Sequence, residues 1–245
     1  MSDPAVTPLI PAATAVVLRD GPDGIEALMG LRNQRLRFAA GLWVFPGGRI
    51  DPLDWPDEHT PVDDLDLGDG YDTPGLVDAG RRAAVREVAE ETGLDLDPST
   101  LVVLSLWTPP AEYPRRFGTV FFVAPSPTFD PELRPDGGEI LELAWITPTE
   151  LLRRRDAGEV EMLPPTYITM DALLAFGTVA EALAAIAEQV PERYGTRLSE
   201  VEGGMVARYA EDVAYDTAEL ADPGPRHRLW MLDRGWSYER DDGAG

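Results

Sequence analysis

The sequence predicts a layered α/β domain. Short apolar and β-branched segments alternate with stretches of helical periodicity, and strands mixed with helices pack in layers around one core. The chain has 245 residues, of which 44% are hydrophobic, so it is long enough for one domain of about 150 residues with a substantial extension.

The first predicted element is a β-hairpin. Residues 12–19 are small or β-branched, residues 21–24 read Gly-Pro-Asp-Gly, and residues 25–31 are again apolar. Residues 42–45 then form a short predicted strand that ends at Pro46-Gly47-Gly48, where two glycines permit unusual backbone angles.

A long loop and a helix follow. Residues 51–75 are rich in Asp, Glu, Pro and Gly without periodicity, which predicts an exposed loop. Residues 76–92 have a helical pattern, and Gly93 is placed as the C-terminal cap.

The second half begins with predicted strands and ends with helical patterns. The strands cover residues 101–107, 119–124 and 141–146, and Thr147 is placed as the N-cap of a short helix. Residues 170–176 and 179–190 are rich in Ala and Leu, and after residue 191 the pattern weakens to irregular or short-stranded structure. We therefore expect a domain at residues 1–160, with an acidic insertion at about 55–77, and a mainly helical extension at 161–245 packed on it.

Composition excludes several classes of function. The net charge is −23 and all 21 basic residues are Arg, which disfavours nucleic acid as a partner. Cysteine is absent, so disulfides and thiolate zinc sites are excluded. The sequence has no long apolar run for a membrane span and no signal-peptide pattern, so we expect a cytoplasmic protein.

Three carboxylates share one face of the helix at residues 76–92. At 100° per residue, Glu87, Glu90 and Glu91 fall within an arc about 100° wide. Clustered carboxylates repel one another unless a cation lies among them, and oxygen ligands suit Mg²⁺ or Mn²⁺. The alternative is a solvated acidic face, which is common in acidic chains.

The context of these glutamates resembles the Nudix box. Arg86-Glu87-Val88-Ala89-Glu90-Glu91-Thr92-Gly93-Leu94 matches its core, R-E-U-x-E-E-x-G-U with U apolar, and Phe45-Pro46-Gly47-Gly48 is similar to the strand that enters it. The resemblance implies a Nudix-type α/β/α sandwich with a mixed sheet. It also implies that Glu87 and Glu91 are the principal metal ligands, that Glu90 is a third, and that Arg86 orients the carboxylates.

The upstream half of the box departs from the pattern G-x5-E-x7-R-E. Five residues after Gly48 the chain has Asp54 instead of Glu, and 31 residues separate Asp54 from Arg86 where the pattern has seven, an insertion of about 24. A competing register uses Asp78, which lacks the matching Gly. The interrupted box and residues 45–54, 115–122, 139–145 and 163–166 resemble peroxisomal-type coenzyme A diphosphatases and their bacterial relatives.

Further site residues follow from the resemblance. Glu139, with Glu142 as its alternative, corresponds to a loop carboxylate that serves as base or extra ligand. The predicted catalytic residues are therefore Glu90, Arg86 and Glu139. Gly47 and Gly48 are predicted to bind substrate, and so are Arg32 and Arg116, as part of the local positive patch that phosphate binding requires in so acidic a chain; pairing with acidic neighbours is their alternative role. Trp107, Tyr113 and Phe117 are expected in the core, with stacking on a base as the alternative, and His227 is expected to be structural.

The implied activity is metal-dependent hydrolysis of a nucleoside diphosphate linked to another moiety, with coenzyme A or acyl-CoA favoured. ADP-ribose, nucleotide sugars and dinucleotide polyphosphates are alternative substrates. A non-catalytic nucleotide sensor and a scaffold are alternatives of other classes, and a homodimer is left open.

Overall fold

The computed structural model describes residues 7–36, 39–55, 75–129 and 132–241. The strands of its larger sheet are β1 (Leu9–Gly21), β2 (Gly24–Arg32), β3 (Trp43–Val44), β4 (Gly47–Arg49), β5 (Val102–Thr108), β6 (Arg116–Pro125), β7 (Ile140–Ile146) and β8 (Glu192–Gly195). Their order is β3-β2-β1-β6-β5-β8, with β4 paired on β1 and β7 on β2. β1 runs parallel to β6 and antiparallel to β2, so the predicted mixed sheet is confirmed.

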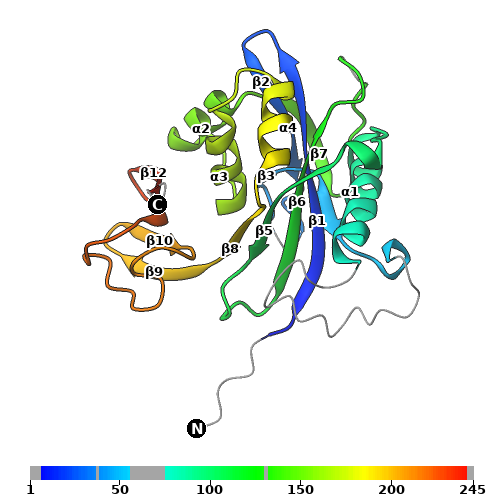
Figure 1. Cartoon of the computed structure of the whole chain (residues 1–245). Helices are drawn as coiled ribbons and strands as arrows, with labels where there is room; N and C mark the ends of the chain where they lie inside the picture. The colour runs from blue at the N-terminus through cyan, green and yellow to red at the C-terminus, as the bar shows by residue number, and fades with distance from the viewer. Residues whose placement is uncertain (1–6, 37–38, 56–74, 130–131, 242–245) are drawn as a thin grey trace.

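Helices cover both faces of this sheet (Figure 1). α1 (Leu76–Thr92) packs on one face, and α2 (Pro148–Asp156), α3 (Pro164–Leu173) and α4 (Val179–Glu188) lie on the other. Neighbouring residues of β1 face opposite sides of the sheet. Ala13 and Val17 belong to the hydrophobic cluster under α1, whereas Val16 and Leu18 belong to the cluster under α2 to α4. The α/β/α sandwich is therefore present.

The predicted helix boundaries hold where capping signals were clear. α1 ends at Thr92, and Gly93 adopts a left-handed conformation at φ 77°. The Thr147 side chain accepts a hydrogen bond from the Glu150 N–H at the start of α2. α3 begins six residues before the predicted residue 170, because Pro164 starts the helix at a position that needs no N–H donor. Residues 56–74, most of the predicted insertion, lie outside the described residues.

The extension is not mainly helical, which corrects the prediction for residues 161–245. Beyond α4, β8 joins the larger sheet beside β5, and four strands form a separate antiparallel sheet. These strands are β9 (Arg197–Val201), β10 (Gly204–Arg208), β11 (His227–Leu232) and β12 (Gly235–Arg240). The Ala- and Leu-rich composition that indicated helices stops at residue 188, and the later strands instead place apolar residues on one sheet face. Within the described ranges, no helix is long and apolar enough to span a membrane.

Candidate active site

The acidic face of α1 turns toward β4. Glu91 has only 5% of its surface exposed, Glu87 is half-buried, and Glu90 is exposed. A purely solvated acidic face would leave all three carboxylates in water. The burial of Glu91 therefore contradicts the solvated-face alternative for this residue.

Two glycines of β4 allow this close approach. The N–H of Gly47 donates a hydrogen bond of 3.0 Å to Glu91 Oε2. A Cβ atom at position 48 would lie 2.4 Å from the carboxyl carbon of Glu87. Gly47 and Gly48 pair with Thr14 and Ala13 of β1, so the central strand fixes their positions. Both glycines therefore contact the glutamates of α1 directly, and their binding of substrate stays a prediction.

Burial makes the two glutamates resist ionisation. The pKa of Glu91 is raised to about 8, mainly by burial; the charges of Glu87 and Glu139 also raise it, while the Gly47 N–H and Arg32 lower it. Burial also raises the pKa of Glu87 against the opposing effect of Arg86. The site is therefore partly desolvated, and an added positive charge would favour the ionised forms of its glutamates.

Arg86 is the cation shared by the carboxylates of the box. Its guanidinium lies 2.9 Å from Asp54 Oδ2, 2.8 Å from Glu87 Oε1 and 3.5 Å from Glu90 Oε2. It also donates to the carbonyl oxygen of Arg49 at 3.0 Å. The hydrogen bond that Arg86 donates to Asp54 is the largest cause that raises the pKa of Arg86. This geometry agrees with the predicted orienting role of Arg86.

The structure distinguishes the two registers of the upstream box. Asp54 lies in a single 3-10 turn, η1 (Pro52–Asp54), where it is 5% exposed and also accepts the Asp51 N–H. Asp78 is exposed on α1 and pairs only loosely with Arg81, at 3.5 Å. Asp54 is therefore the carboxylate that contacts Arg86, despite the long insertion that follows it.

Arg32 and Glu139 complete the cluster from the opposite side. Arg32 Nη2 lies 3.1 Å from Glu139 Oε2, and Nε of Arg32 is buried without a hydrogen-bond partner among the described residues. The charge of Glu139 raises the pKa of both Glu87 and Glu91. Arg32 and Glu139, predicted separately from distant segments, thus pair with each other, and the charge of Glu139 acts on the α1 glutamates.

Arg116 does not join this cluster, which corrects its predicted place in the site. Only 7% of the Arg116 surface is exposed, and its guanidinium donates hydrogen bonds to the carbonyl oxygens of Pro109 and Thr7. It pairs with Leu9 on β1, four residues from the partner of Gly48 and hence about 13 Å along the strand. The guanidinium instead satisfies backbone acceptors at the beginning of β6.

The other flagged side chains have structural surroundings. Trp107 is buried and stacks on Tyr194 with ring centroids 3.8 Å apart, while Tyr113 is exposed. Phe117 is partly buried beneath the guanidinium of Arg115. His227 is buried, and its Nδ1 lies 2.6 Å from the carbonyl oxygen of Ala210. Trp107 and His227 therefore match their expected structural roles, and Tyr113 does not.

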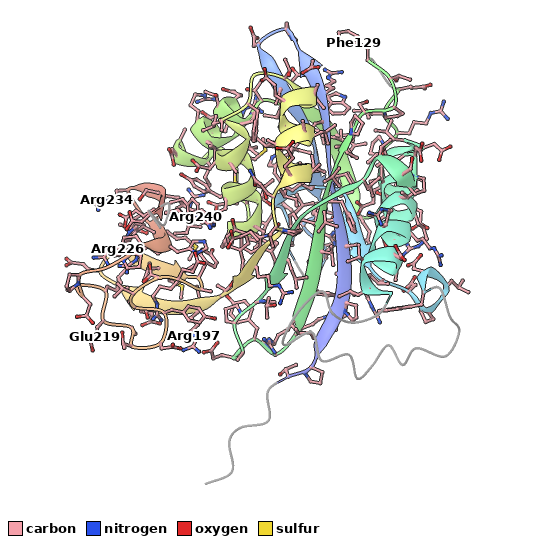
Figure 2. All side chains as sticks on the ribbon, in the orientation of Figure 1. Phe129, Arg197, Glu219, Arg226, Arg234 and Arg240 are labelled. Atoms are coloured by element: carbon pink, nitrogen blue, oxygen red, sulfur yellow. The ribbon has the colours of Figure 1, made fainter. Side chains whose placement is uncertain are left out.

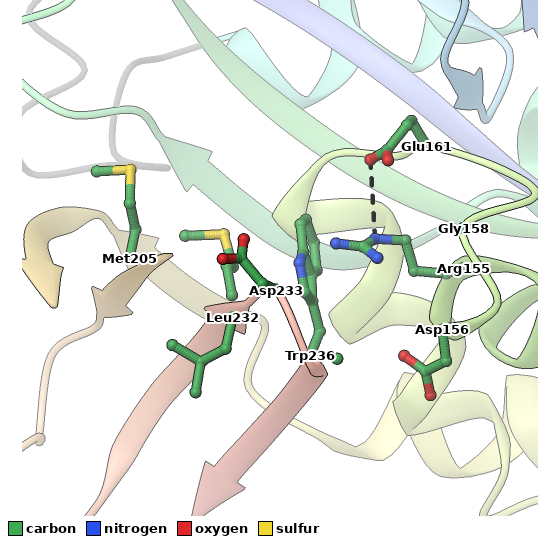
Figure 3. A pocket seen from close by; sticks show the side chains of 10 residues that line it. Arg155, Asp156, Gly158, Glu161, Met205, Leu232, Asp233 and Trp236 are labelled. Atoms are coloured by element: carbon green, nitrogen blue, oxygen red, sulfur yellow. Dashed lines mark ion pairs between the residues drawn. The ribbon is translucent and has the colours of Figure 1, made fainter. Parts of the chain in front are cut away.

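A pocket of about 490 Å³ lies elsewhere, between the end of α2 and the C-terminal sheet (Figure 3). Arg155 stacks over Trp236 at 4.1 Å on one side of it, and Met205 and Leu232 belong to the sheet side. None of the predicted site residues lines this pocket. In Figure 2, Arg197 of β9, Arg226 just before β11 and Arg234 between β11 and β12 lie on the opposite side of the view from α1. The carboxylate cluster, and not this pocket, has the chemistry of a phosphate-cleaving site.

Two residues near the cluster were not identified from the sequence. Asn33 and Asp136 make hydrogen bonds to the loop that carries Glu139. Residues 135–138 read Pro-Asp-Gly-Gly, which is typical of a turn, and an Asp before Gly-Gly signals a side chain that can accept hydrogen bonds from nearby backbone N–H groups. Asn33 gave no signal of its own beyond its place after a strand.

Comparison with known proteins identifies the family. The NUDIX domain model matches residues 9–164. The crystal structure of a NUDIX hydrolase from Alicyclobacillus acidocaldarius is similar at 26% identity and a TM-score of 0.59, covering 74% of this chain and 97% of the other. A MutT NUDIX hydrolase from Burkholderia pseudomallei matches at 22% identity and a TM-score of 0.45, covering 67% and 97%. The NUDIX domain of Shewanella oneidensis NrtR, complexed with ADP ribose, matches at 16% identity and a TM-score of 0.46, covering 71% and 94%. With the box residues assembled between α1 and β4, this chain belongs to the Nudix family and is a Nudix hydrolase.

Proposed function

We propose that this Nudix hydrolase cleaves the phosphoanhydride bond of a nucleoside diphosphate linked to a second moiety, with Mg²⁺ or Mn²⁺ held by Glu87, Glu90 and Glu91. Nudix enzymes act on small nucleotide-derived substrates and generally use such metals. The observation that carries the proposal is the desolvated pair Glu87 and Glu91 against the Gly47-Gly48 backbone.

The residues present fit a hard divalent cation. All donors are carboxylate oxygens, and burial disfavours the ionised forms of Glu87 and Glu91, which a bound cation would stabilise. No three carboxylates of the described residues converge on one ion position as they stand. Because Arg86 holds Glu87 and lies near Glu90, cation binding requires these side chains to exchange an arginine partner for the ion.

Different residues of the chain have different roles in the proposed reaction. The Gly47 N–H fixes Glu91, and Asp54 holds Arg86 beside the glutamates. In this proposal Arg32 donates hydrogen bonds to a phosphate oxygen, and Glu139 accepts a proton from the attacking water. A bound divalent cation supplies charge neutralisation and a lowered water pKa. Water attacks phosphorus, the P–O bond of the anhydride breaks, and two phosphate esters leave.

The favoured substrate is coenzyme A or an acyl-CoA. Support comes from the interrupted box and from residues 45–54, which resemble the peroxisomal-type coenzyme A diphosphatases. ADP-ribose, nucleotide sugars and dinucleotide polyphosphates are the competing substrates. These compounds share the anhydride and differ in the group attached to it.

A substrate panel tests the proposal. The protein is assayed with coenzyme A, acetyl-CoA, ADP-ribose, a nucleotide sugar and a dinucleotide polyphosphate at millimolar Mg²⁺ and Mn²⁺, and cleavage products are quantified chromatographically. We expect turnover of at least one substrate, reduced about 100-fold or more by Glu91→Gln because a metal ligand is lost. Glu132→Gln, which removes an exposed carboxylate paired with Arg134, is the control and should retain activity.

Two results contradict the proposal. If no panel member is cleaved although nucleotides bind, the domain is a sensor instead of an anhydride hydrolase. If Glu91→Gln is as active as the wild type, the reaction does not depend on the carboxylate cluster.

A further inference from the structure

The Glu139 carboxylate lies on an exposed loop, yet its backbone is held on both sides. The Glu139 side chain is 58% exposed, and its only described ion pair is with Arg32. A carboxylate on a free loop would sample many positions at a cost to catalysis, since misplacement by about 1 Å can slow a reaction about 100-fold. The hydrogen bonds that hold the loop therefore bear on where this group acts.

Asp136 binds the N-terminal side of Glu139. Asp136 Oδ2 accepts the Glu139 N–H at 2.9 Å, and Oδ1 accepts the Ile140 N–H at 2.7 Å. Burial raises the pKa of Asp136, but bonds from backbone N–H groups outweigh it and lower the pKa overall. The side chain is thus an ionised acceptor that closes the turn, with Gly137 at φ 72°.

Asn33 binds the carbonyl side of the same loop. Its backbone N–H donates to the Glu139 carbonyl oxygen at 2.8 Å, and its Nδ2 donates to the Gly138 carbonyl oxygen at 2.9 Å. Its Oδ1 accepts the Arg35 N–H at 3.0 Å, which fixes the amide plane. Asn33 follows Arg32 directly, so one segment supplies both the partner of the Glu139 carboxylate and the anchor of its backbone.

The pairing of β2 with β7 changes register at this point. Leu31 pairs with Glu142, whereas Arg32 pairs with Ile140, so Leu141 is an extra residue in β7. Such bulges re-aim side chains and are frequent beside active sites. The bulge, Asp136 and Asn33 together determine the direction in which Glu139 leaves the sheet.

We propose that Asn33 and Asp136 are positioning residues, which hold the Glu139 backbone and thereby keep its carboxylate in place beside Arg32. The inference rests on the proposed function, in which Glu139 takes part in the reaction. It adds two residues outside the Nudix box to the machinery that determines the rate.

A double-mutant cycle tests the catalytic part. Glu139→Gln, Asn33→Ala and the double variant are assayed on a substrate that turns over. We expect Asn33→Ala to lower kcat about tenfold with little change in KM, because it misplaces Glu139 without removing a substrate contact. The double variant should be no slower than Glu139→Gln alone, since the positioning residue acts through Glu139. Asn33→Asp, which keeps the acceptor for Arg35 and loses the donor to Gly138, should behave like Asn33→Ala.

Hydrogen exchange tests the positioning without activity. The Glu139 amide should exchange at least tenfold faster in Asp136→Ala than in the wild type, because its acceptor is removed. Asp97→Ala is the matched control: Asp97 accepts the Ser99 N–H at 2.8 Å in a turn remote from the site, so its loss should leave Glu139 exchange and kcat unchanged. Asn33 is the only asparagine in the chain, so asparagine-selective ¹⁵N labelling also gives one side-chain amide signal, which should shift in Asp136→Ala.

The possible results distinguish failure of the positioning role of Asn33 and Asp136 from failure of the proposed hydrolase function. Wild-type kcat in Asn33→Ala, additive losses in the double variant, or unchanged Glu139 exchange in Asp136→Ala would each overturn the positioning proposal. Wild-type kcat in Glu139→Gln would also overturn it, while the metal site at Glu87 and Glu91 stands. If no substrate is turned over, the proposed function is contradicted instead. Hydrogen exchange of the Glu139 amide still decides whether Asp136 holds the loop that carries Glu139.

Discussion

At the scale of single residues, the site depends on how Arg86 is shared. One guanidinium contacts Asp54, Glu87 and Glu90, and it is held in place by the carbonyl oxygen of Arg49. Asp54 is the most buried of these carboxylates and accepts two hydrogen bonds from Arg86. Although Asp is one methylene shorter than the Glu of the family pattern, the 3-10 turn brings it within reach.

Replacing Asp54 should therefore affect both folding and catalysis. Asp54→Asn removes a charge-assisted partner of Arg86, and we expect about 1–3 kcal/mol of lost stability, because hydrogen bonds to charged groups have this magnitude. We also expect about a tenfold lower kcat, since Arg86 then orients the glutamates less well. Urea denaturation and steady-state kinetics measure the two effects. Asp78→Asn, at the exposed alternative position, should change stability by less than about 0.5 kcal/mol. Equal effects of the two substitutions would contradict the assignment of Asp54.

At the scale of elements, the site is the contact between α1 and β4. The two glycines differ in what surrounds them: an added Cβ at Gly47 would lie 2.4 Å from the carbonyl oxygen of Ala13, whereas one at Gly48 meets only the end of the Glu87 side chain. A backbone neighbour cannot move as freely as a side chain. Equivalent substitutions should therefore have different consequences.

We predict that Gly47→Ala and Gly48→Ala separate stability from metal binding. Gly47→Ala should cost about 1–3 kcal/mol in thermal unfolding, because it forces β4 away from β1. Gly48→Ala should leave the melting temperature of the metal-free protein nearly unchanged and weaken Mn²⁺ binding about tenfold or more by displacing Glu87, as measured by isothermal titration calorimetry. If Gly48→Ala binds Mn²⁺ normally, Glu87 is not a ligand that needs this approach.

The C-terminal sheet is stabilised by a buried ion pair. Arg228 and Asp212 lie 2.6 Å apart with side-chain exposures of 1% and 0%, and Asp212 also accepts the N–H groups of His227 and Ala214. Asp212→Asn leaves Arg228 buried without a charge partner, so we expect a loss of about 3–5 kcal/mol in urea unfolding. The exposed pair Arg197–Asp216 provides the control, and Asp216→Asn should cost less than about 0.5 kcal/mol. A similar small cost at both positions would mean that the sheet does not depend on the pair.

At the scale of the whole molecule, buried groups and a large negative charge set the response to pH. His227 is buried among Tyr194, Tyr209 and Tyr238, and burial lowers its pKa below the usual 6.5. The folded protein thus holds this histidine neutral where the unfolded chain would protonate it. The contribution of His227 to stability is full above pH 6.5 and declines as the pH falls below that value, because the unfolded state binds the additional proton.

The consequence can be measured as a difference in how steeply the free energy of unfolding changes with pH. We expect the free energy of unfolding of the wild type to fall more between pH 7.5 and pH 5 than that of His227→Gln, which has no titrating ring. Other ionisable groups contribute equally to both proteins, including those behind the net charge of −23. Parallel pH profiles in urea denaturation would show that His227 is not held neutral in the fold.

The sequence alone predicted a layered α/β domain and a helix with Glu87, Glu90 and Glu91 on one face, and the resemblance of its residues 86–94 to the Nudix box implied the sandwich and the grouping of Arg86 with those glutamates. These features depend on local periodicity, capping and spacing along one helix, which are written in contiguous residues. Only the tertiary structure decided which distant segments meet. It placed Asp54 rather than Asp78 on Arg86, brought Arg32 and Glu139 to the α1 glutamates, left Arg116 with backbone carbonyls, and formed a sheet where a helical extension was expected. Such contacts depend on strand order and register across the whole chain, and these are long-range properties that local patterns do not encode.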